Sequence, residues 1–354
     1  MSQQLIFTDS PALELDRVVG DIDPTGRIFI LTDDHTASLV LPRLSEESYI
    51  ARQAQVITIP SGDVNKSLDS LAHIWDCLVD GGATRKSLMI NLGGGMVTDI
   101  GGFAASTFKR GIRFVNMPTT LLAAVDASVG GKTGINFHGL KNEIGVFSQA
   151  DAVIISTTYF DTLPVEELLS GYGEMLKHGL LESLDSFNKL MAYDVTARDM
   201  KALLPILEEN VDVKRRVVEE DPTERGLRKA LNLGHTPAHA FESWAMRRQK
   251  PIPHGYAVAF GLLVDLILSH MLYGFDSAVL QQYAATLREL YGTLPITCND
   301  YDALIDYMHH DKKNVSGTDI NFSLLEAPGK VHLDSIVPED KIRQALDIFR
   351  DLVQ

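Results

Sequence analysis

The sequence predicts an α/β domain followed by a helical domain. Over roughly the first 150 residues, short apolar runs alternate with helical patterns, which is typical of a largely parallel sheet covered by helices. Beyond about residue 158, long amphipathic segments dominate instead. We therefore assign residues 1–157 to the α/β domain and residues 158–354 to the helical domain.

Individual elements follow from apolar runs and their stop signals. In the first domain we expect a helix at 66–80 and strands at 27–32, 55–59, 87–92, 114–117 and 152–156. In the second domain the 3.6-residue period predicts helices at 165–181, 200–219, 236–248, 255–273, 277–291 and 339–352. A small hairpin of 321–325 with 330–333 is expected around Pro328-Gly329. Any active site would lie between the two domains.

Composition narrows the class of protein. With 45% hydrophobic and 22% charged residues, the chain can bury a sizeable core. The net charge of -15 argues against nucleic acid or an anionic membrane as partner. The two cysteines, Cys77 and Cys298, cannot build a disulfide framework, so we expect buried free thiols.

We expect neither a targeting segment nor a membrane span. Its first residues lack a basic region followed by an apolar run, so no secretory signal is expected. The most apolar stretch, 257–275, contains Asp265 and His270 and is shorter than the ~20 apolar residues of a membrane span. We expect a buried core helix there and a cytoplasmic protein.

Three features at strand ends favour a dinucleotide. Gly93-Gly94-Gly95 follows a strand and opens a helical run, where free N–H groups and the helix dipole attract phosphate. Asp33 ends an earlier strand, and Thr119-Thr120 follows a later one. Alone, the glycines could form a tight turn and Asp33 could be a turn former. Together they favour a Rossmann-like dinucleotide-binding domain.

A basic stretch favours an anionic substrate. Residues 85–142 hold seven Lys or Arg and two Asp, a local charge of +5 in an acidic chain. Lys109-Arg110, Lys132 and Lys141 stand among glycines and small residues, so we interpret them as cations presented by loops. The alternative is a solvated basic face. The prediction is a pocket for phosphate or carboxylate.

Four side chains are candidate metal ligands. His235 and His239 are four residues apart, His254 begins another predicted helix, and Glu174 offers a carboxylate upstream. If Thr236 caps a helix, His235 lies just before that helix and His239 lies inside it. Two histidines, one carboxylate and an open position are typical of catalytic zinc. The alternative is that these are core histidines and that the spacing is accidental.

Many short motifs in one order resemble a known family. The motifs are Ser61-Gly62-Asp63 with Lys66, Gly93-Gly94-Gly95 with Asp99, Lys109-Arg110-Gly111, Pro118-Thr119-Thr120 with Asp126, Gly130-Gly131-Lys132, Lys141-Asn142, Gly173-Glu174 with Lys177, Lys214, Arg228, Leu231-Asn232-Leu233-Gly234-His235-Thr236, His239, His254-Gly255 and Asp311-Lys312-Lys313. On these motifs, over about residues 30–330, the chain resembles the 3-dehydroquinate synthases of the shikimate pathway, within the sugar phosphate cyclase superfamily.

The resemblance implies roles for individual residues. The divalent metal, zinc or cobalt, would be held by Glu174, His235 and His254. NAD would be held by Asp33, Asp63, Lys66, Gly94, Gly95, Asp99, Thr119 and Thr120, with Lys132 and Lys141. The substrate pocket would be lined by Arg110, Asp126, Lys132, Lys141, Asn142, Lys177, Lys214, Arg228, Asn232 and His239.

The resemblance also implies an activity and a homodimer. The substrate would be 3-deoxy-D-arabino-heptulosonate 7-phosphate, which carries one carboxylate and one phosphate. Transient oxidation by NAD, phosphate elimination, reduction and an intramolecular aldol closure would give 3-dehydroquinate. Alternatives are another sugar phosphate cyclase, whose substrate lacks the carboxylate, or a glycerol-dehydrogenase-like enzyme that would release NADH.

Some positions depart from the family pattern. Tyr256 stands after His254-Gly255 where Glu is usual, which leaves open how the His254 ring is oriented. Asp63 stands where Glu is commoner, and His35 where Asn is typical. None of these departures removes a predicted metal ligand.

Overall fold

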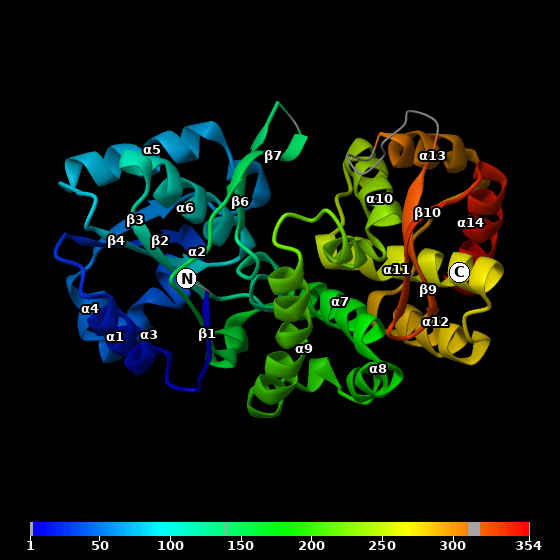
Figure 1. The fold of residues 1–354 in the computed structure, drawn as a ribbon, viewed down its shortest axis with the longest axis horizontal. Helices are drawn as coiled ribbons and strands as arrows, with labels where there is room; N and C mark the ends of the chain where they lie inside the picture. The colour runs from blue at the N-terminus through cyan, green and yellow to red at the C-terminus, as the bar shows by residue number, and fades with distance from the viewer. Residues whose placement is uncertain (1–2, 139, 311–318, 354) are drawn as a thin grey trace. The chain divides into compact units, whose positions relative to one another are not determined.

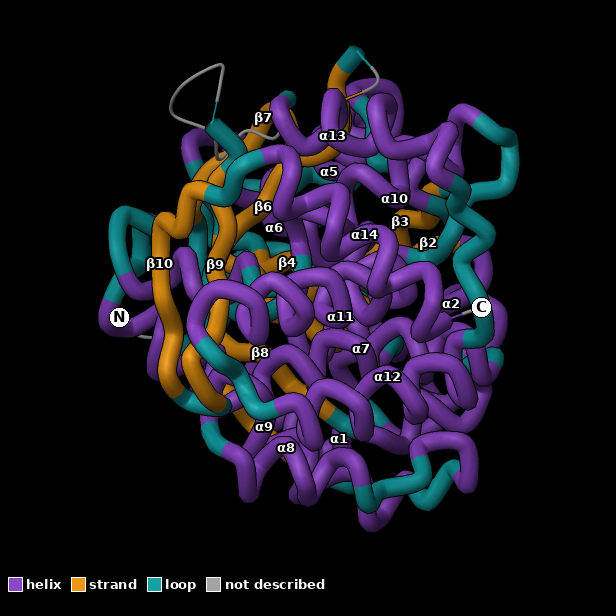
Figure 2. The backbone as a smooth tube through the Cα atoms, turned by 90° about the vertical axis from the view of Figure 1, so that its right-hand side faces the viewer, coloured by secondary structure: helices purple, strands orange, loops and turns teal. Residues whose placement is uncertain are grey.

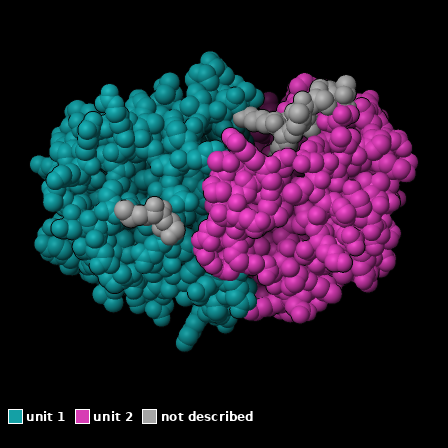
Figure 3. Space-filling model, viewed as in Figure 1, with its two compact units in different colours: residues 1–164, 198–211 teal, residues 165–197, 212–354 magenta. Residues whose placement is uncertain are grey.

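The computed structural model describes residues 3–138, 140–310 and 319–353. The predicted Asp311-Lys312-Lys313 motif lies outside the described residues. The chain forms two compact units, Met1–Pro164 with Arg198–Val211, and Val165–Ala197 with Asp212–Gln354 (Figure 3). The functional boundary that we place at residue 157 stays a prediction.

A six-stranded parallel sheet is the centre of the first unit (Figure 1). Its order is β1-β8-β5-β4-β2-β3, with β1 Gln4–Phe7, β2 Ile28–Asp33, β3 Gln55–Ile59, β4 Leu88–Gly93, β5 Arg113–Pro118 and β8 Ala152–Ile155. Strands β4 and β8 are buried throughout, as expected for a parallel sheet covered on both faces. The chain runs outward from β2 to β3 and returns to β4, so the carboxyl ends of β2 and β4 flank the reversal of strand order.

The α/β prediction is confirmed, and its five strands correspond to β2, β3, β4, β5 and β8. The predicted helix at 66–80 is α5 (Leu68–Asp80), and the run after the glycines is α6 (Gly95–Thr107). Sequence reasoning did not identify β1, which has only four residues, or the helices before β3. Those helices are α1 (Pro11–Ile22), α2 (Asp34–Leu39), α3 (Leu41–Glu47) and α4 (Tyr49–Gln53).

The interpretation of Lys132 and Lys141 as loop residues is wrong. Lys132 begins β6 (Lys132–Phe137), and Lys141 lies in β7 (Leu140–Phe147), which pairs antiparallel with β6. Strand β7 is exposed along its whole length, so it carries no alternation of buried and exposed side chains from which a strand could be predicted. The two lysines therefore stand on a paired ribbon.

The second unit consists mainly of helices and confirms the predicted pattern. Its helices are α7 (Val165–Glu182), α8 (Leu184–Met191), α10 (His235–Arg247), α11 (His254–Tyr273), α12 (Ser277–Tyr291), α13 (Tyr301–His309) and α14 (Glu339–Val353). Helix α9 (Met200–Glu220) contributes its residues from Asp212 onward. Strands β9 (Asn321–Ala327) and β10 (Lys330–Ile336) form the predicted hairpin. The short helices α8 and α13 were not predicted.

Helix α11 is the core of this unit. It is long and apolar enough to cross a membrane by composition alone, but 78% of its apolar window is buried inside the protein. It packs against α7, α10, α12, α14 and β9, several of which surround it in Figure 2. The predicted core helix is thus confirmed. Both cysteines are free, but neither is buried as expected: Cys77 is half-buried in α5, and Cys298 is exposed in the turn before α13.

Two glycines of α11 allow neighbouring backbones to approach closely. A Cβ on Gly255 would lie 1.7 Å from the carbonyl oxygen of Ser170 in α7. A Cβ on Gly261 would lie 2.0 Å from the carbonyl oxygen of Gly234, directly before α10. Neither backbone atom can move like a flexible side chain. The starts of α10 and α11 and the middle of α7 are thereby held together.

We predict that Gly261→Ala lowers the free energy of unfolding by at least about 1–3 kcal/mol, because the added methyl overpacks the α10–α11 contact. Urea unfolding followed by circular dichroism measures this. Gly20→Ala is the control, since Gly20 is exposed in α1 and a Cβ added there would have no atom within 4 Å. That variant should gain up to about 1 kcal/mol from helix propensity. Equal stability of the two variants would contradict the close approach.

Asp300 shows how a buried carboxylate is satisfied in this unit. Trp244 Nε1 donates to it over 2.9 Å and Arg248 over 2.7 Å, and the Thr297 backbone N–H donates over 2.8 Å. Burial alone would raise the pKa of Asp300. The hydrogen bonds from Trp244 and Thr297 and the charge of Arg248 together lower it below the ordinary 3.8.

This lowered pKa predicts a pH dependence. Asp300 contributes its stability above pH 3.8 and loses it as the pH falls through the lower pKa of the folded protein. The difference in unfolding free energy between the wild type and Asp300→Asn should therefore be full at neutral pH and shrink under acid. Denaturant titrations at several pH values measure it. A difference that grows on acidification would contradict the assignment.

Candidate functional site

The second unit brings together three of the four candidate metal ligands. One donor atom each from Glu174, His235 and His254 lies within 4.8 Å of the others. Glu174 Oε1 is 3.5 Å from His235 Nε2 and 3.4 Å from His254 Nε2. These residues are far apart in sequence, so the fold itself assembles the cluster.

Each of the three residues is placed by a helix. Glu174 lies in the middle of α7 with no exposed side-chain surface, while His235 and His254 are the first residues of α10 and α11. The expected cap at Thr236 is wrong. Gly234 precedes the helix with φ at 78°, and its N–H donates to the buried carboxylate of Asp265. Thr236 instead donates its hydroxyl to the carbonyl of Asn321, because it already lies inside α10.

Both imidazole rings are oriented through their second nitrogen. His235 Nδ1 lies 3.1 Å from the carbonyl oxygen of Leu233, which accepts only if Nδ1 carries the proton. His254 Nδ1 lies 3.5 Å from the carboxylate of Glu242 on α10. In both rings, Nε2 is therefore the nitrogen that faces Glu174 and the position a metal would occupy.

The charge of Glu174 is balanced inside the protein. Its Oε2 is ion-paired with Lys177, one turn further along α7. Burial alone would raise the pKa of Glu174, but Lys177, His235 and His254 hold it well below its ordinary value. Burial alone would lower the pKa of His254, but Glu242 and Glu174 raise it to about 10 in the metal-free protein.

The donor set fits a divalent metal. A tetrahedral zinc with bonds of about 2.0–2.1 Å separates its donor atoms by roughly 3.3–3.4 Å. The separations from Glu174 Oε1, 3.4 and 3.5 Å, match that value. Oε1 faces both imidazole Nε2 atoms, whereas Oε2 is ion-paired with Lys177. The carboxylate thus directs one oxygen to Lys177 and the other to the position a metal would occupy.

His239 lies next to this cluster. Its ring centroid is 5.7 Å from that of His235 and 6.5 Å from that of His254. It is not among the residues whose donor atoms converge with Glu174. This arrangement agrees with the resemblance, which assigns His239 to the substrate, but that role stays a prediction.

Other predicted pocket residues of this unit are buried cations. Lys177, Lys214 and Arg228 are each more than nine-tenths buried. Arg228 donates to the carbonyl of Pro222 over 2.8 Å. Asn232 donates over 2.9 Å to Glu224, a residue that sequence reasoning did not single out. Glu224 has φ at 61°, and such strain in a non-glycine residue is a signal that only a structure shows.

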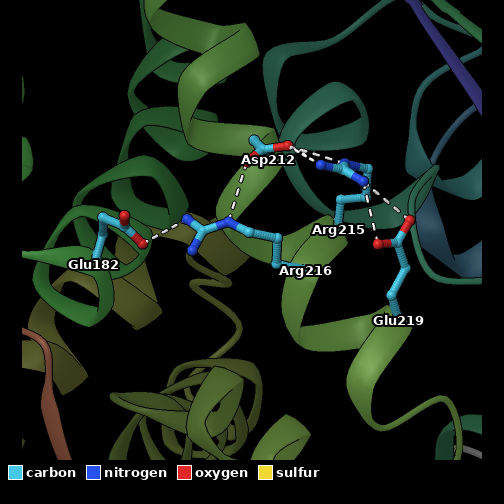
Figure 4. Close-up of polar contacts among 5 residues, drawn as sticks. All are labelled: Glu182, Asp212, Arg215, Arg216 and Glu219. Atoms are coloured by element: carbon cyan, nitrogen blue, oxygen red, sulfur yellow. Dashed lines mark hydrogen bonds and ion pairs between the residues drawn. The ribbon is translucent and has the colours of Figure 1, made fainter.

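An ion-pair network lies along α9 and reaches the end of α7 (Figure 4). Its members are Glu182, Asp212, Arg215, Arg216 and Glu219. Arg216 connects Asp212 on α9 with Glu182 at the end of α7, over 3.1 and 2.6 Å. Each pair is exposed enough to stabilise only weakly. Only the Arg216–Glu182 pair joins α9 to the helix that carries Glu174.

In the first unit, the dinucleotide candidates lie at the carboxyl ends of strands. Gly93 pairs with Pro118 across β4 and β5, and the Thr119 N–H donates to the Gly93 carbonyl over 3.0 Å. Gly94 caps α6, and a Cβ on it would lie 3.2 Å from Thr120. Gly95 is the first residue of α6. Asp33 ends β2 and caps α2, because its side chain accepts a hydrogen bond from the Thr36 N–H. This contact fits the alternative interpretation of Asp33 as a turn-forming residue.

A polar group beside this edge joins further candidates. Buried Lys66 is ion-paired with Asp99 and donates to Asn142. Asp63 lies 3.8 Å from Lys141 and accepts from Asn136. Arg110 and Lys132 are exposed, and Asp126 lies in a π-helical turn of residues 123–127. The roles of all these residues stay predictions.

Glu242 is the clearest residue that sequence reasoning missed. It lies seven residues after His235 and three after His239, so all three share one face of α10. That spacing was a usable signal. Tyr256 stands where the family usually has Glu, which left open how the His254 ring is oriented. The Tyr256 ring packs against that of Tyr291, with 4.9 Å between ring centroids.

We predict that Glu174→Gln weakens zinc binding by at least about 100-fold. Loss of a residue that only hydrogen-bonds to a metal ligand costs about 10–100-fold, and loss of a charged ligand should cost more. The substitution keeps the shape and removes the charge that faces both rings. Competition with a chromophoric chelator measures the affinity. Glu182→Gln on the same helix is the control and should bind zinc like the wild type. Unchanged affinity in Glu174→Gln would remove Glu174 from the ligand set.

Comparisons with known proteins agree with the resemblance. Family models described as "3-dehydroquinate synthase N-terminal" and "3-dehydroquinate synthase C-terminal" match residues 56–170 and 171–314. A 3-dehydroquinate synthase of Parabacteroides distasonis is 48% identical over 92% of both chains. One from Pyrococcus abyssi is 40% identical over 98% of this chain and 100% of that one.

Solved structures show the same fold. A 2-epi-5-epi-valiolone synthase from Streptomyces hygroscopicus, with NAD+ and Zn2+ bound, has a TM-score of 0.85 and 24% identity, over 99% of this chain and 97% of that one. A 2-deoxy-scyllo-inosose synthase complexed with carbaglucose-6-phosphate, NAD+ and Co2+ has a TM-score of 0.82 and 21% identity, over 98% and 96%. With both family models matched in order and close relatives along nearly its whole length, the chain belongs to the 3-dehydroquinate synthase family.

Proposed function

We propose that this protein converts 3-deoxy-D-arabino-heptulosonate 7-phosphate to 3-dehydroquinate and phosphate, as a phosphate-eliminating lyase of the shikimate pathway. The observation that carries the proposal is the converging donor set of Glu174, His235 and His254 in a chain 48% identical to a 3-dehydroquinate synthase. A catalytic metal ligand set of this type leaves an open position for substrate oxygens.

NAD and a divalent zinc or cobalt ion are the proposed cofactors. Glu174, His235 and His254 would hold the metal, and the strand-end residues around Gly94, Gly95 and Asp99 would hold NAD. Two proteins of the same fold contain NAD+ with Zn2+ or Co2+. When bound, NAD supplies reversible hydride transfer and the metal supplies Lewis acidity at substrate oxygens.

The chain's own residues would bind and orient the two anionic ends of the substrate. Lys177, Lys214 and Arg228 are buried cations of the helical unit, suited to a carboxylate or phosphate that has left water. Their burial removes competing water and strengthens each charge interaction. Lys132 and Lys141 of the first unit are further cations proposed to bind the substrate.

Proton movement would fall to His239 and its neighbours. Its ring lies beside the ligand histidines without converging on Glu174, so it can reach a substrate oxygen held by the same centre. The ketone formed by oxidation acidifies the neighbouring C–H, whose proton would pass to the phosphate group as its C–O bond breaks and phosphate leaves. For the proton of the substrate oxygen, a positioned imidazole contributes about 10²–10⁴-fold.

The remaining expectations are part of the same proposal. We propose a cytoplasmic homodimer whose partner is a small molecule with a carboxylate and a phosphate, and not nucleic acid or a membrane. The buried position of the one apolar helix that could span a membrane, among the residues that the structure describes, agrees with this. The net charge of -15 agrees as well.

The proposal is tested by supplying NAD, zinc or cobalt and the heptulosonate phosphate to the purified protein. We expect phosphate and 3-dehydroquinate in equal amounts without net NADH, because the hydride returns within each turnover. The same assay on His239→Ala should lose turnover by at least about 100-fold while zinc binding is kept.

Two results would overturn the proposal. Net accumulation of NADH would indicate an alcohol dehydrogenase. Activity only with sedoheptulose 7-phosphate or glucose 6-phosphate would indicate another sugar phosphate cyclase.

A further inference from the structure

Glu242 is a buried carboxylate of the helical unit to which the proposed reaction assigns no role. Glu242 is 6% exposed. It lies two turns into α10, on the same face as His235 and His239. A buried carboxylate is costly unless a cation or a set of donors stabilises it. A cation or hydrogen-bond donor in this unit must therefore stabilise the Glu242 carboxylate.

His254 lies directly between two carboxylates. Its Nδ1 is 3.5 Å from Glu242 Oε1, and its Nε2 is 3.4 Å from Glu174 Oε1. The two acids therefore occupy opposite nitrogens of one ring. Since Glu174 belongs to the metal-ligand set, Glu242 faces the nitrogen that the metal leaves free.

The position of His254 explains why a carboxylate is needed there. His254 is the first residue of the 20-residue helix α11, whose N-terminus carries partial positive charge. Lys177 adds a full positive charge beside Glu174. A dication at this place therefore requires more negative charge than Glu174 alone supplies. His235 needs no such partner, because the Leu233 carbonyl already fixes its ring.

We propose that Glu242 is a positioning residue that accepts the Nδ1 proton of His254 and so presents Nε2 to the metal. This inference rests on the proposed metal centre and extends it to a residue outside the ligand set. The carboxylate fixes the tautomer and raises the basicity of the ligand nitrogen, which strengthens the bond to a metal. Tyr256, packed on Tyr291, does not take this role.

The test compares Glu242→Gln with Asp300→Asn. Both substitutions neutralise a buried carboxylate of the same unit, and Asp300 contacts the same helix through Trp244 and Arg248. Chelator competition gives zinc affinity, the visible spectrum of the cobalt form reports ligand geometry, and thermal unfolding of the metal-free protein reports stability.

We expect Glu242→Gln to bind zinc roughly 10–100-fold more weakly and to change the cobalt spectrum. Asp300→Asn should lose stability and keep both the zinc affinity and the cobalt spectrum. Wild-type affinity and spectrum in Glu242→Gln would overturn the inference. Equal weakening of zinc binding by both substitutions would also overturn it, because the effect would then be general loss of structure.

A measurement on the wild type does not require that a substituted protein folds. ¹⁵N spectra of histidine-labelled, zinc-loaded protein should show His254 with a protonated Nδ1 and a metal-bound Nε2. A metal-bound Nδ1 would overturn the inference. If the wild type binds no zinc, the metal centre itself fails. If zinc binds normally while turnover is absent, only the proposed reaction fails.

Discussion

The carboxylate of Glu174 carries a negative charge with no exposure to water, so the groups around it have to balance that charge. Lys177 takes one oxygen, and the ring nitrogens of His235 and His254 face the other. This division of the two oxygens leaves a polar position that a divalent metal fits. The packing of α7, α10 and α11 keeps these donor atoms in place.

The packing of α11 supplies the required rigidity. Gly255 and Gly261 bring its backbone against α7 and against the residue before α10, so the two histidine-bearing helix starts cannot drift apart. Asp265, inside the same helix, accepts the Gly234 N–H and fixes the turn that presents His235. Glu242 Oε1, on α10, lies 3.5 Å from His254 Nδ1. One core helix thus holds both candidate ligand histidines in place through close backbone contacts and the carboxylate of Asp265.

Sequence reasoning captured the layers of the fold because buried parallel strands and amphipathic helices leave periodic patterns. It missed β1, which is too short for a period, and β7, which is exposed along its length. At the metal centre, spacing left four candidate ligands, and motif resemblance reduced them to three. Neither was used to identify Glu242: its spacing from His235 and His239 placed it on their face of α10, but its contact with His254 also depends on how α10 packs on α11. The Thr236 cap was wrong because Gly234 adopts a positive φ that allows the helix to begin at His235, two residues earlier than a Thr236 cap would allow.

The identity of the metal ligands is the central claim, and X-ray absorption at the zinc edge of the loaded protein measures it most directly. We expect only nitrogen and oxygen donors at about 2.0–2.1 Å, with outer-shell scattering from two imidazole rings. The same spectrum should be found for His239→Ala. A sulfur donor at about 2.3 Å, or scattering from three imidazole rings that falls to two in His239→Ala, would contradict the assignment of Glu174, His235 and His254.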